Sequence, residues 1–506
     1  MLIFKQKNMK KININKIVAI IIIALGGFSC SDDFVDVKSN AKNSEDFFKT
    51  EQDYQDALVG AYDLLQSTYL NVMLGEIASD NTLAGGESAT DVVGIQEVDD
   101  MIHTPLNAQL RDIWGWMFSG VNRANYIMEF KDNLDFEGKE QVLAQARFLR
   151  AYYYFELVKW FGDVPLIVDK RILFGEQFVI ERSPKSDIYA QIEADLIYAA
   201  DNLPYIQSEA GRVTKGAAQA LLGKAYLYQE KFGEAANVLD NLILNGPHNL
   251  VADYNTIFEA AGENNIESVF EVQYSESEGA GFGCLQCSEG NVAVGFSGIR
   301  NYAATPGSAG DIFSSGFSFN VPVKDAFDAF QPEDLRRDVA ILDIDAWAAS
   351  TGATFGVGFE HTGYFNRKYI PRVRAINAQG DRNLTNPNNY RAIRFADVLL
   401  MAAEAFNRSS SSNDAKAQEY LNRVRARAFG NTLNNITATG ATLTENILSE
   451  RRLELVGEGH RFFDLVRTGK AAQAINGFVA GKHEIFPIPE IEIQLAGDRW
   501  EQNPNY

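Results

Sequence analysis

Residues 141–161 constrain the fold more than any other stretch, because they are apolar on two sides when read at helical spacing. A helix with two apolar sides must be covered on both, so neighbouring helices are expected to pack on it. Gly162 and Pro165 end the pattern, since glycine tolerates the left-handed cap conformation and proline cannot continue the hydrogen-bond ladder. The two stripes consist of Ala144, Phe148, Ala151, Phe155 and Val158, and of Leu149, Tyr153, Leu157 and Trp160.

Helical periodicity recurs on both sides of this stretch. Before it, we expect one helix from residue 44 to about 65, capped by Ser44 or Asp46, and a second over 106–131. After it, Pro184 suits the first turn of a helix that runs to about residue 203. Residues 214–245 have the spacing of a tetratricopeptide hairpin, although Gln219 stands where that repeat prefers tryptophan.

The helical pattern resumes near the C-terminus, over residues 390–405, then around 421–428 and 447–455. A single tetratricopeptide-like pair cannot bury itself, so the flanking helix pairs are expected to stack with it. We therefore predict a mainly α fold in which tetratricopeptide-like helix pairs form a scaffold.

Residues 247–388 differ from the helical parts, because Gly, Asn, Ser and Phe dominate and the strand-like runs, such as 268–273, are few and short. A loop-rich segment of this length is costly to order, so we expect the functional surface to lie here. We predict one domain over 30–506: an N-terminal helical part at about 44–246, this loop-rich ligand segment at about 247–388, and a C-terminal helical part with its tail at about 389–506.

The first 29 residues have the features of a secretory signal peptide, with several lysines, no acidic residue and a short apolar run at 17–25. A membrane span would need about 20 apolar residues. Small residues lead to Cys30, as in the lipobox of a bacterial lipoprotein, although Gly27 stands where leucine is common. Cys30 is therefore the predicted lipidation site, and the alternative is ordinary signal cleavage that leaves a free cysteine.

The formal net charge of −21 at pH 7 argues against nucleic acids and anionic lipid surfaces as partners, because both would be repelled. Attachment to a membrane would then come from the lipid rather than from a basic face of the protein.

The remaining cysteines, Cys284 and Cys287, form a lone Cys-x-x-Cys motif. Without a second pair or a nearby histidine, they are too few to hold a structural zinc ion. In an exported protein we expect a tight local disulfide, and the alternative is two free thiols.

Catalytic motifs are missing from the sequence, which contains no Gly-x-Ser-x-Gly elbow, no phosphate-binding loop and no His-Glu-x-x-His. The histidines are scattered, and we predict no metal and no cofactor. Glu76 with Asp80, or Asp343 with Asp345, could serve a glycosidase, but acidic residues are so abundant that such pairs arise by chance. We predict that the chain is not an enzyme, and a glycosidase remains an alternative.

Aromatic residues in the loop-rich segment are the better signal of function. Their flat faces stack on the C–H faces of sugar rings, while neighbouring Asp, Asn and Arg side chains bind hydroxyl groups. Trp347 lies in this segment, and Tyr302 lies beside Arg300 and Asn301. Trp347, Tyr302 and Arg300 are therefore candidate ligand residues, with core packing as the alternative for the aromatic pair.

Several runs together resemble one family, the SusD/RagB outer-membrane nutrient-binding lipoproteins. They occur in family order from the start of the mature chain to its last residues. The runs are Phe47-Phe-Lys-Thr-x-x-Asp53, Ala146-Arg-Phe-Leu-Arg-Ala-Tyr-x-Tyr-Phe155, Phe161-Gly-Asp-Val-Pro165, Arg394-Phe-Ala-Asp-Val-Leu-Leu-Met-x-Ala-Glu404, Glu450-Arg-Arg-x-Glu-Leu-x-x-Glu-Gly-x-Arg-Phe-Phe-Asp464, Phe486-Pro-Ile-Pro489 and Gln502-Asn-Pro504.

The resemblance implies a helical scaffold with an irregular segment that carries the ligand site, and it implies no catalytic activity. It also implies a partner, a SusC-like TonB-dependent β-barrel transporter, over which the lipoprotein sits as a lid. Acidic residues after Cys30 resemble the export tag that sends such lipoproteins to the cell surface in Bacteroidetes. Asp80 and Asn81 match a position near the ligand site of family members, and the alternative is a turn that ends a helix.

Our leading hypothesis is a lipid-anchored outer-membrane protein, facing the cell exterior, that binds a glycan or oligosaccharide and delivers it to the transporter. The alternatives are a peptide- or protein-binding repeat scaffold at the outer membrane, and a glycosidase. Arg367, Lys368, Arg372, Arg374 and Arg382 leave open whether the glycan is neutral or acidic.

Overall fold

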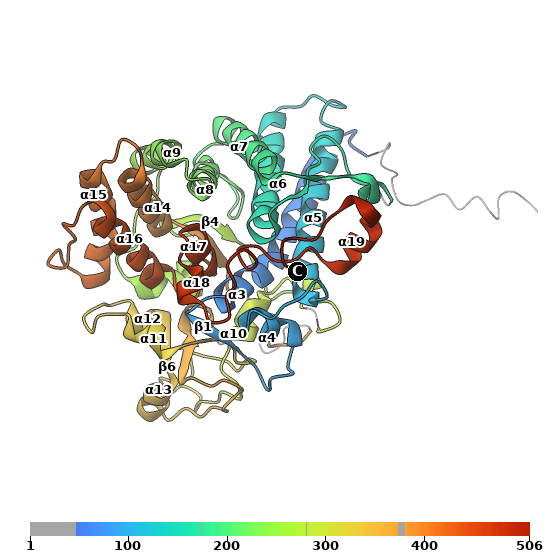
Figure 1. Cartoon of the computed structure of the whole chain (residues 1–506). Helices are drawn as coiled ribbons and strands as arrows, with labels where there is room; N and C mark the ends of the chain where they lie inside the picture. The colour runs from blue at the N-terminus through green and yellow to red at the C-terminus, as the bar shows by residue number, and fades with distance from the viewer. Residues whose placement is uncertain (1–46, 174, 280, 373–379) are drawn as a thin grey trace, which may run out of the picture. The chain divides into compact units, whose positions relative to one another are not determined.

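The structure is a computed structural model that describes residues 47–506, except 174, 280 and 373–379. The predicted signal peptide and Cys30 lie outside the described residues. Residues 50–506 form one compact unit, shown in Figure 1, which is mainly helical, as predicted.

The scaffold consists of long helices that pack on one another largely in chain order. Helix α2 packs on α5, α5 on α6, and so on through α7, α8 and α9; α9 then packs on α14, which contacts α15 and α16. Helices α8 and α9 are the hairpin predicted at 214–245, so the helix-pair scaffold is confirmed. The bounds are α2 Glu51–Asp63, α5 Ala108–Glu129, α6 Lys139–Phe161, α7 Lys185–Asn202, α8 Lys215–Tyr228, α9 Phe232–Asn245, α14 Phe395–Arg408, α15 Asp414–Phe429 and α16 Gly440–Leu455.

Helix α6, predicted from its two apolar stripes, is buried on both sides between α5 and α7. Tyr153 is fully buried and donates its hydroxyl to the carbonyl oxygen of Ala61 over 2.6 Å. Arg150 binds Asp195 of α7 through two hydrogen bonds of 2.8 and 2.7 Å. The aromatic residues of this helix therefore belong to the core of the scaffold.

The start of α2 differs from the prediction. Thr50 is its N-cap and forms a capping box with Asp53, in which each residue accepts a backbone N–H of the other. The predicted caps, Ser44 and Asp46, lie outside the described residues.

Residues 390–394 were predicted to begin a helix, and this prediction is wrong. They form strand β8 (Tyr390–Arg394), which pairs antiparallel with β4 (Ser268–Val272), and the helix begins only at Phe395. The strand is buried on both faces, and its two basic residues, Arg391 and Arg394, are three apart with apolar residues between them, which resembles helical spacing in the sequence. Pairing with β4, more than 100 residues earlier in the chain, decides its conformation.

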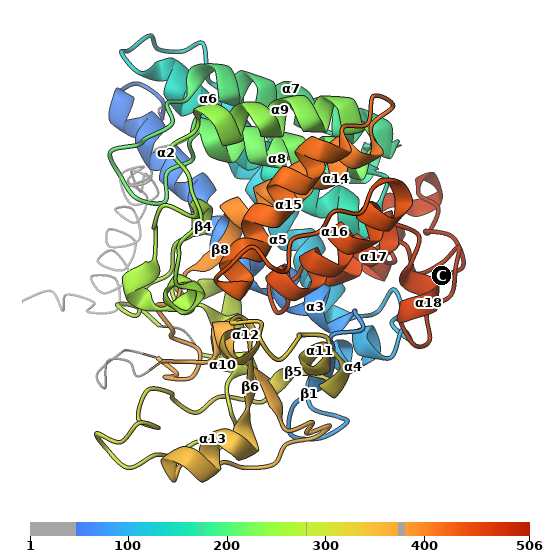
Figure 2. The same ribbon diagram turned by 90° about the vertical axis from the view of Figure 1, so that its left-hand side faces the viewer.

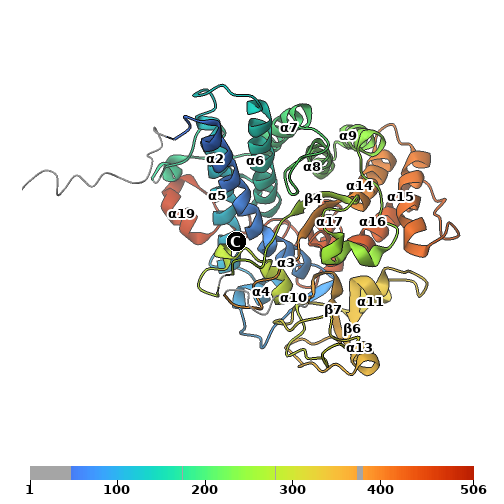
Figure 3. The ribbon, with the colours of Figure 1, turned by 180° about the vertical axis from the view of Figure 1, so that it is seen from behind.

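The loop-rich segment contains short strands, as expected, and also short helices, which were not predicted. Figure 2 shows α6 to α9 at one side of the unit and α13 at the opposite side, and Figure 3 shows α10, β6, β7 and α13 gathered beyond α3 from behind. Within the described residues, the strands pair as two-stranded antiparallel sheets. The pairs are β1 (Thr82–Gly85) with β5 (Phe319–Pro322), β2 (Val164–Pro165) with β3 (Arg182–Ser183), β4 with β8, and β6 (Ile341–Asp343) with β7 (Tyr364–Asn366).

The shorter helices join these parts. Their bounds are α3 Tyr69–Ile77, α4 Val93–Asp99, α10 Val292–Ser297, α11 Lys324–Asp328, α12 Arg337–Ala340, α13 Ile344–Thr351, α17 Arg461–Arg467, α18 Ala471–Ala474 and α19 Glu490–Ala496.

Buried charges hold the C-terminal helices to the loop-rich segment. Arg394, which is fully buried, binds Glu267 over 2.7 Å, Glu454 over 2.8 Å and Glu458 over 2.7 and 2.9 Å. Arg336 binds Glu454 from the other side, over 2.9 Å. These charges are compensated by close hydrogen bonds, as burial requires. The charged positions of the sequence motifs at 394–404 and 450–464 thus have a structural role.

Candidate functional site

The two predicted aromatic ligand residues come together in the structure. The indole Nε1 of Trp347 donates to the hydroxyl of Tyr302 over 2.9 Å, and that hydroxyl donates to the carbonyl oxygen of Gly310 over 2.6 Å. The ring of Phe313 lies 5.3 Å from that of Trp347 and 6.1 Å from that of Tyr302. Burial raises the pKa of Tyr302, so its hydroxyl stays protonated at neutral pH. We call Tyr302, Phe313 and Trp347 the Trp347 cluster.

A helix, rather than a loop, positions Trp347. It lies on α13, whose N-terminus is capped by Asp343, because the carboxylate of this residue accepts the N–H of Ala346 over 2.9 Å. Asp343, which the sequence offered as half of a catalytic pair, thus has a capping role. The guanidinium of Arg367 lies 5.7 Å from the centre of the Trp347 ring.

The Trp347 cluster is built on a small hydrophobic core of its own. Tyr302 is only 7% exposed, whereas Trp347 and Phe355 pack against this core and remain partly exposed. The partly exposed aromatic surface available to a ligand therefore belongs to Trp347 and Phe355. The other buried members of the core are Ile299, Leu342, Ile344, Ala353, Phe365 and Ile370.

Arg300 is two residues from Tyr302, but its side chain takes part in different contacts. Its Nε donates to Ser318 Oγ over 3.1 Å and its Nη2 to the carbonyl oxygen of Phe317 over 2.9 Å. The carboxylates of Glu87 and Asp91 lie 3.6 and 3.8 Å from the guanidinium. The structure therefore places Arg300 at the edge of the segment around residues 316–318 rather than in the Trp347 cluster.

Asp80 and Asn81 lie against the C-terminal helices. Asp80 accepts two hydrogen bonds of 2.7 Å from Arg461. Burial favours a higher pKa for Asp80, but Arg461 and Arg452 outweigh it and lower the pKa below its usual value, so this carboxylate is ionised. Asn81 is fully buried and accepts from Nε of Arg452 over 2.9 Å. Their role at a ligand stays a prediction.

Glu76, the partner of Asp80 in the other candidate catalytic pair, is fully buried as well. It accepts the backbone N–H groups of Gly457 and Gly459 over 2.9 and 3.0 Å. Among the described residues, no hydrogen bond or ion pair joins Asp80 or Asn81 to Arg300, Tyr302 or Trp347.

The sequence analysis missed a second exposed aromatic residue in the loop-rich segment. Phe282 is 61% exposed and lies 5.5 Å from the ring of Phe317. Cys284 and Cys287 are joined by a disulfide in the same turn. The available signal was the position of Phe282 between two glycines, outside any periodic apolar pattern.

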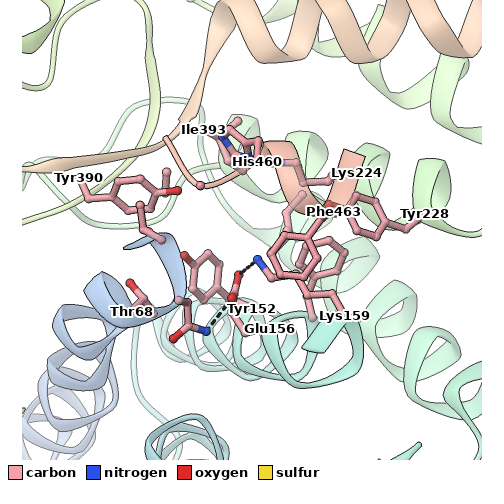
Figure 4. Close-up of a pocket in the computed structure, with 16 residues that line it drawn as sticks. Thr68, Tyr152, Glu156, Lys159, Lys224, Tyr228, Tyr390, Ile393, His460 and Phe463 are labelled. Atoms are coloured by element: carbon pink, nitrogen blue, oxygen red, sulfur yellow. Dashed lines mark hydrogen bonds and ion pairs between the residues drawn. The ribbon is translucent and has the colours of Figure 1, made fainter. Parts of the chain in front are cut away.

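Figure 4 shows an interior cavity between α3, α6, α8, β8 and α17. Lys159 donates to Glu156 over 2.6 Å in this cavity, and Asn71 donates to the other carboxylate oxygen over 2.7 Å. Its volume of about 30 Å³ is enough for a water molecule but too small for a sugar ring.

The helical side carries a larger hollow of about 310 Å³ beside α5 and α19. Trp114, Phe118 and Trp500 line it, and the rings of Trp114 and Trp500 lie 6.0 Å apart. Both tryptophans are less than 8% exposed, and Trp500 donates to the carbonyl oxygen of Ile180 over 2.8 Å. Phe118 is therefore the aromatic ring that this hollow offers to a ligand.

The described part of the chain contains no group of three or more His, Cys, Asp or Glu side chains arranged to hold a metal ion. In the same residues, no helix combines the length and the apolar character that crossing a membrane would take.

Comparison with known proteins shows two matching family models. The SusD family model matches residues 343–485, and a SusD-like model described as starch-binding and associating with the outer membrane matches residues 33–227. A curated relative, SusD-like protein P2 of Formosa agariphila, is 28% identical and aligns over 91% of this chain and 94% of its own length.

Solved structures match over nearly the whole chain. A laminarin binding SusD-like protein is 36% identical, with a TM-score of 0.80 over 91% of this chain and 100% of that one. Surface glycan-binding protein A from Bacteroides thetaiotaomicron, in complex with laminarihexaose, is 27% identical, with a TM-score of 0.77 over 90% of this chain and 100% of that one.

Proposed function

The chain belongs to the SusD family, and from this premise we propose that it is a cell-surface protein that binds a neutral, laminarin-type oligosaccharide. Relatives that bind laminarin or laminarihexaose support the ligand class. The formal charge of −21 supports a neutral glycan over an acidic one, because an acidic chain would be repelled.

The observation that carries the proposal is the position of Trp347. Its ring is partly exposed on a rigid helix and is oriented by the hydrogen bond to Tyr302. A fixed aromatic face reduces the entropy lost when a sugar ring stacks on it. SusD-like glycan-binding proteins are non-catalytic, which confirms that the chain is not an enzyme and removes the glycosidase alternative.

Isothermal titration calorimetry with laminarihexaose tests the proposal, with hexasaccharides of other linkages and an acidic glycan as comparisons. We expect laminarihexaose to bind and Trp347→Ala to abolish most of that binding. Ala349→Ser, an exposed change on the same helix, is the matched control and should bind as the wild type does. Failure of the wild-type protein to bind any glycan would overturn the proposal.

A further variant distinguishes the two aromatic surfaces. Phe118→Ala removes the partly exposed ring of the hollow on the helical side and should leave binding unchanged. If Phe118→Ala loses binding while Trp347→Ala keeps it, the glycan binds on the helical side and our assignment of the site is wrong.

The family premise also supports a lipid anchor at Cys30 and a SusC-like TonB-dependent transporter as partner. Affinity purification from detergent-solubilised membranes should recover a β-barrel transporter with the wild-type protein. Cys30→Ser should release the protein from the membrane fraction, and retention of this variant in that fraction would contradict lipidation.

A further inference from the structure

Phe282 is a large aromatic residue exposed to solvent in a turn that is otherwise tightly held. Its exposed fraction of 61% is unusual for phenylalanine, because most of the ring stays in water and the gain from burying apolar surface is forgone. Added Cβ atoms at the neighbouring Gly281 and Gly283 would meet nothing within 4 Å. The backbone on both sides of Phe282 is therefore uncrowded.

A series of rings connects Phe282 to the core. The ring of Phe282 lies 5.5 Å from Phe317, Phe317 lies 5.8 Å from Phe296, and Phe296 lies 5.2 Å from Phe319. Phe317 is partly exposed, whereas Phe296 and Phe319 are buried. Phe282 is thus the exposed end of a series of contacting aromatic rings, and the other end, Phe319, is buried.

The turn that carries Phe282 is closed by a hydrogen bond and is followed directly by a turn that is closed by a disulfide. The N–H of Cys284 donates to the carbonyl oxygen of Gly281 over 3.1 Å and closes the turn around Phe282, and the Cys284–Cys287 disulfide closes the turn that follows directly. Directly after the turn, Ser288 is buried and donates its hydroxyl to the carbonyl oxygen of Leu384 over 3.3 Å. A short loop held in this way loses little conformational freedom when a ligand binds.

Polar groups adjoin the outer rings. Arg300 donates to the carbonyl oxygen of Phe317 over 2.9 Å, and Glu87 and Asp91 lie beside the same guanidinium. Glu87 is 77% exposed on its side chain, so its carboxylate is available to hydroxyl groups. Exposed aromatic faces next to charged hydrogen-bonding groups are the chemistry that recognises a sugar ring.

We propose that Phe282, Phe317 and Arg300 form a second glycan contact, separate from the Trp347 cluster, and that the Cys284–Cys287 disulfide holds Phe282 in position for it. The proposal rests on the glycan-binding function proposed above. Phe313 packs on Trp347 and Phe317 packs on Phe282, and the four residues from Phe313 to Phe317 bridge at most ~14 Å of backbone. In this proposal one oligosaccharide of several units contacts both places, whereas a disaccharide contacts one.

The second contact therefore selects for the length of the glycan. We expect Phe282→Ala to weaken laminarihexaose binding by about 3- to 10-fold, a typical effect of one aromatic stacking contact, and to leave laminaribiose binding unchanged. Phe282→Trp should restore the affinity. Leu433→Ala, which removes a 90% exposed apolar side chain from another loop, is the control and should have no effect.

The disulfide is tested with the double variant Cys284→Ser/Cys287→Ser. It should weaken hexasaccharide binding as Phe282→Ala does, while the thermal unfolding of the scaffold stays close to that of the wild type. Equal hexasaccharide affinity for the wild type and Phe282→Ala would overturn the second contact, even when Trp347→Ala abolishes binding. Loss of binding in Phe282→Ala with full binding in the double serine variant would overturn the role of the disulfide. A wild-type protein that binds no glycan would instead overturn the proposed function itself.

Discussion

Trp347 and Tyr302 are joined by a hydrogen bond of 2.9 Å from the indole N–H to the phenolic oxygen, across 45 residues of sequence. The same oxygen donates to the carbonyl group of Gly310, so a single hydroxyl ties helix α13 to two parts of the loop-rich segment. Under the proposed function, Tyr302, which is almost buried, would act on the ligand through the orientation of Trp347.

Tyr302→Phe tests this relationship directly. The change removes the hydroxyl, leaves two polar groups without their partner, and should lower the free energy of unfolding by about 1–3 kcal/mol. It should also weaken laminarihexaose binding, because Trp347 loses its fixed orientation. Urea denaturation and calorimetry measure the two effects. A Tyr302→Phe protein that binds with wild-type affinity would show that the hydrogen bond does not orient the site.

Tyr153→Ala should destabilise the fold without changing the choice of ligand. Tyr153 is fully buried, and its ring packs so closely on Gly120 that a Cβ there would lie 2.6 Å from it. Removing a buried aromatic ring costs about 3–5 kcal/mol, whereas Tyr153→Phe should cost only about 1–3 kcal/mol for the hydrogen bond to Ala61. Denaturation gives the stabilities, and glycan titration gives the ligand preference. Retained stability with lost binding would contradict the structural role.

Arg394→Met should be strongly destabilising, by about 3–5 kcal/mol, because it leaves Glu267, Glu454 and Glu458 buried without their shared partner. Lys324→Met is the matched control: it removes a cation from an exposed pair with Asp328 and should change stability by less than about 1 kcal/mol. Chemical denaturation of both variants measures the difference. Similar losses in the two proteins would mean that burial does not determine the importance of these ion pairs.

Asp99 gives a pH-dependent prediction. Burial raises its pKa to about 7, and the nearby carboxylates of Glu360 and Asp100 add to the effect. In the unfolded chain its pKa is about 3.9, so its contribution to stability is present at about pH 4 and is lost as the pH rises through 7. Asp99→Asn keeps an oxygen for the backbone N–H of Ala84 and should raise the melting temperature relative to wild type at pH 8 but not at pH 4. An equal difference at both values would contradict the raised pKa.

Some features of the candidate site could be predicted from the sequence and others could not. Trp347 and Tyr302 were candidates because they are aromatic residues in a loop-rich segment, and the structure brings them together. Nothing in the local pattern could show that they share a hydrogen bond. Likewise, residues 390–394 were misassigned as helical, because the pairing of β8 with β4 depends on a distant part of the chain.

The sequence by itself determined the helical scaffold and the family. Helix formation and the burial of an apolar stripe depend on residues three or four apart, and each family motif is a short continuous run of residues. Only the tertiary structure decided what the motif charges do and where the aromatic rings lie. The partners of Arg394 come from two separate segments, around residue 267 and over residues 454–458, and the series of rings from Phe282 to Phe319 forms only when the loops fold against one another. Contacts between distant segments depend on packing and desolvation of the whole unit, which no short stretch of sequence encodes.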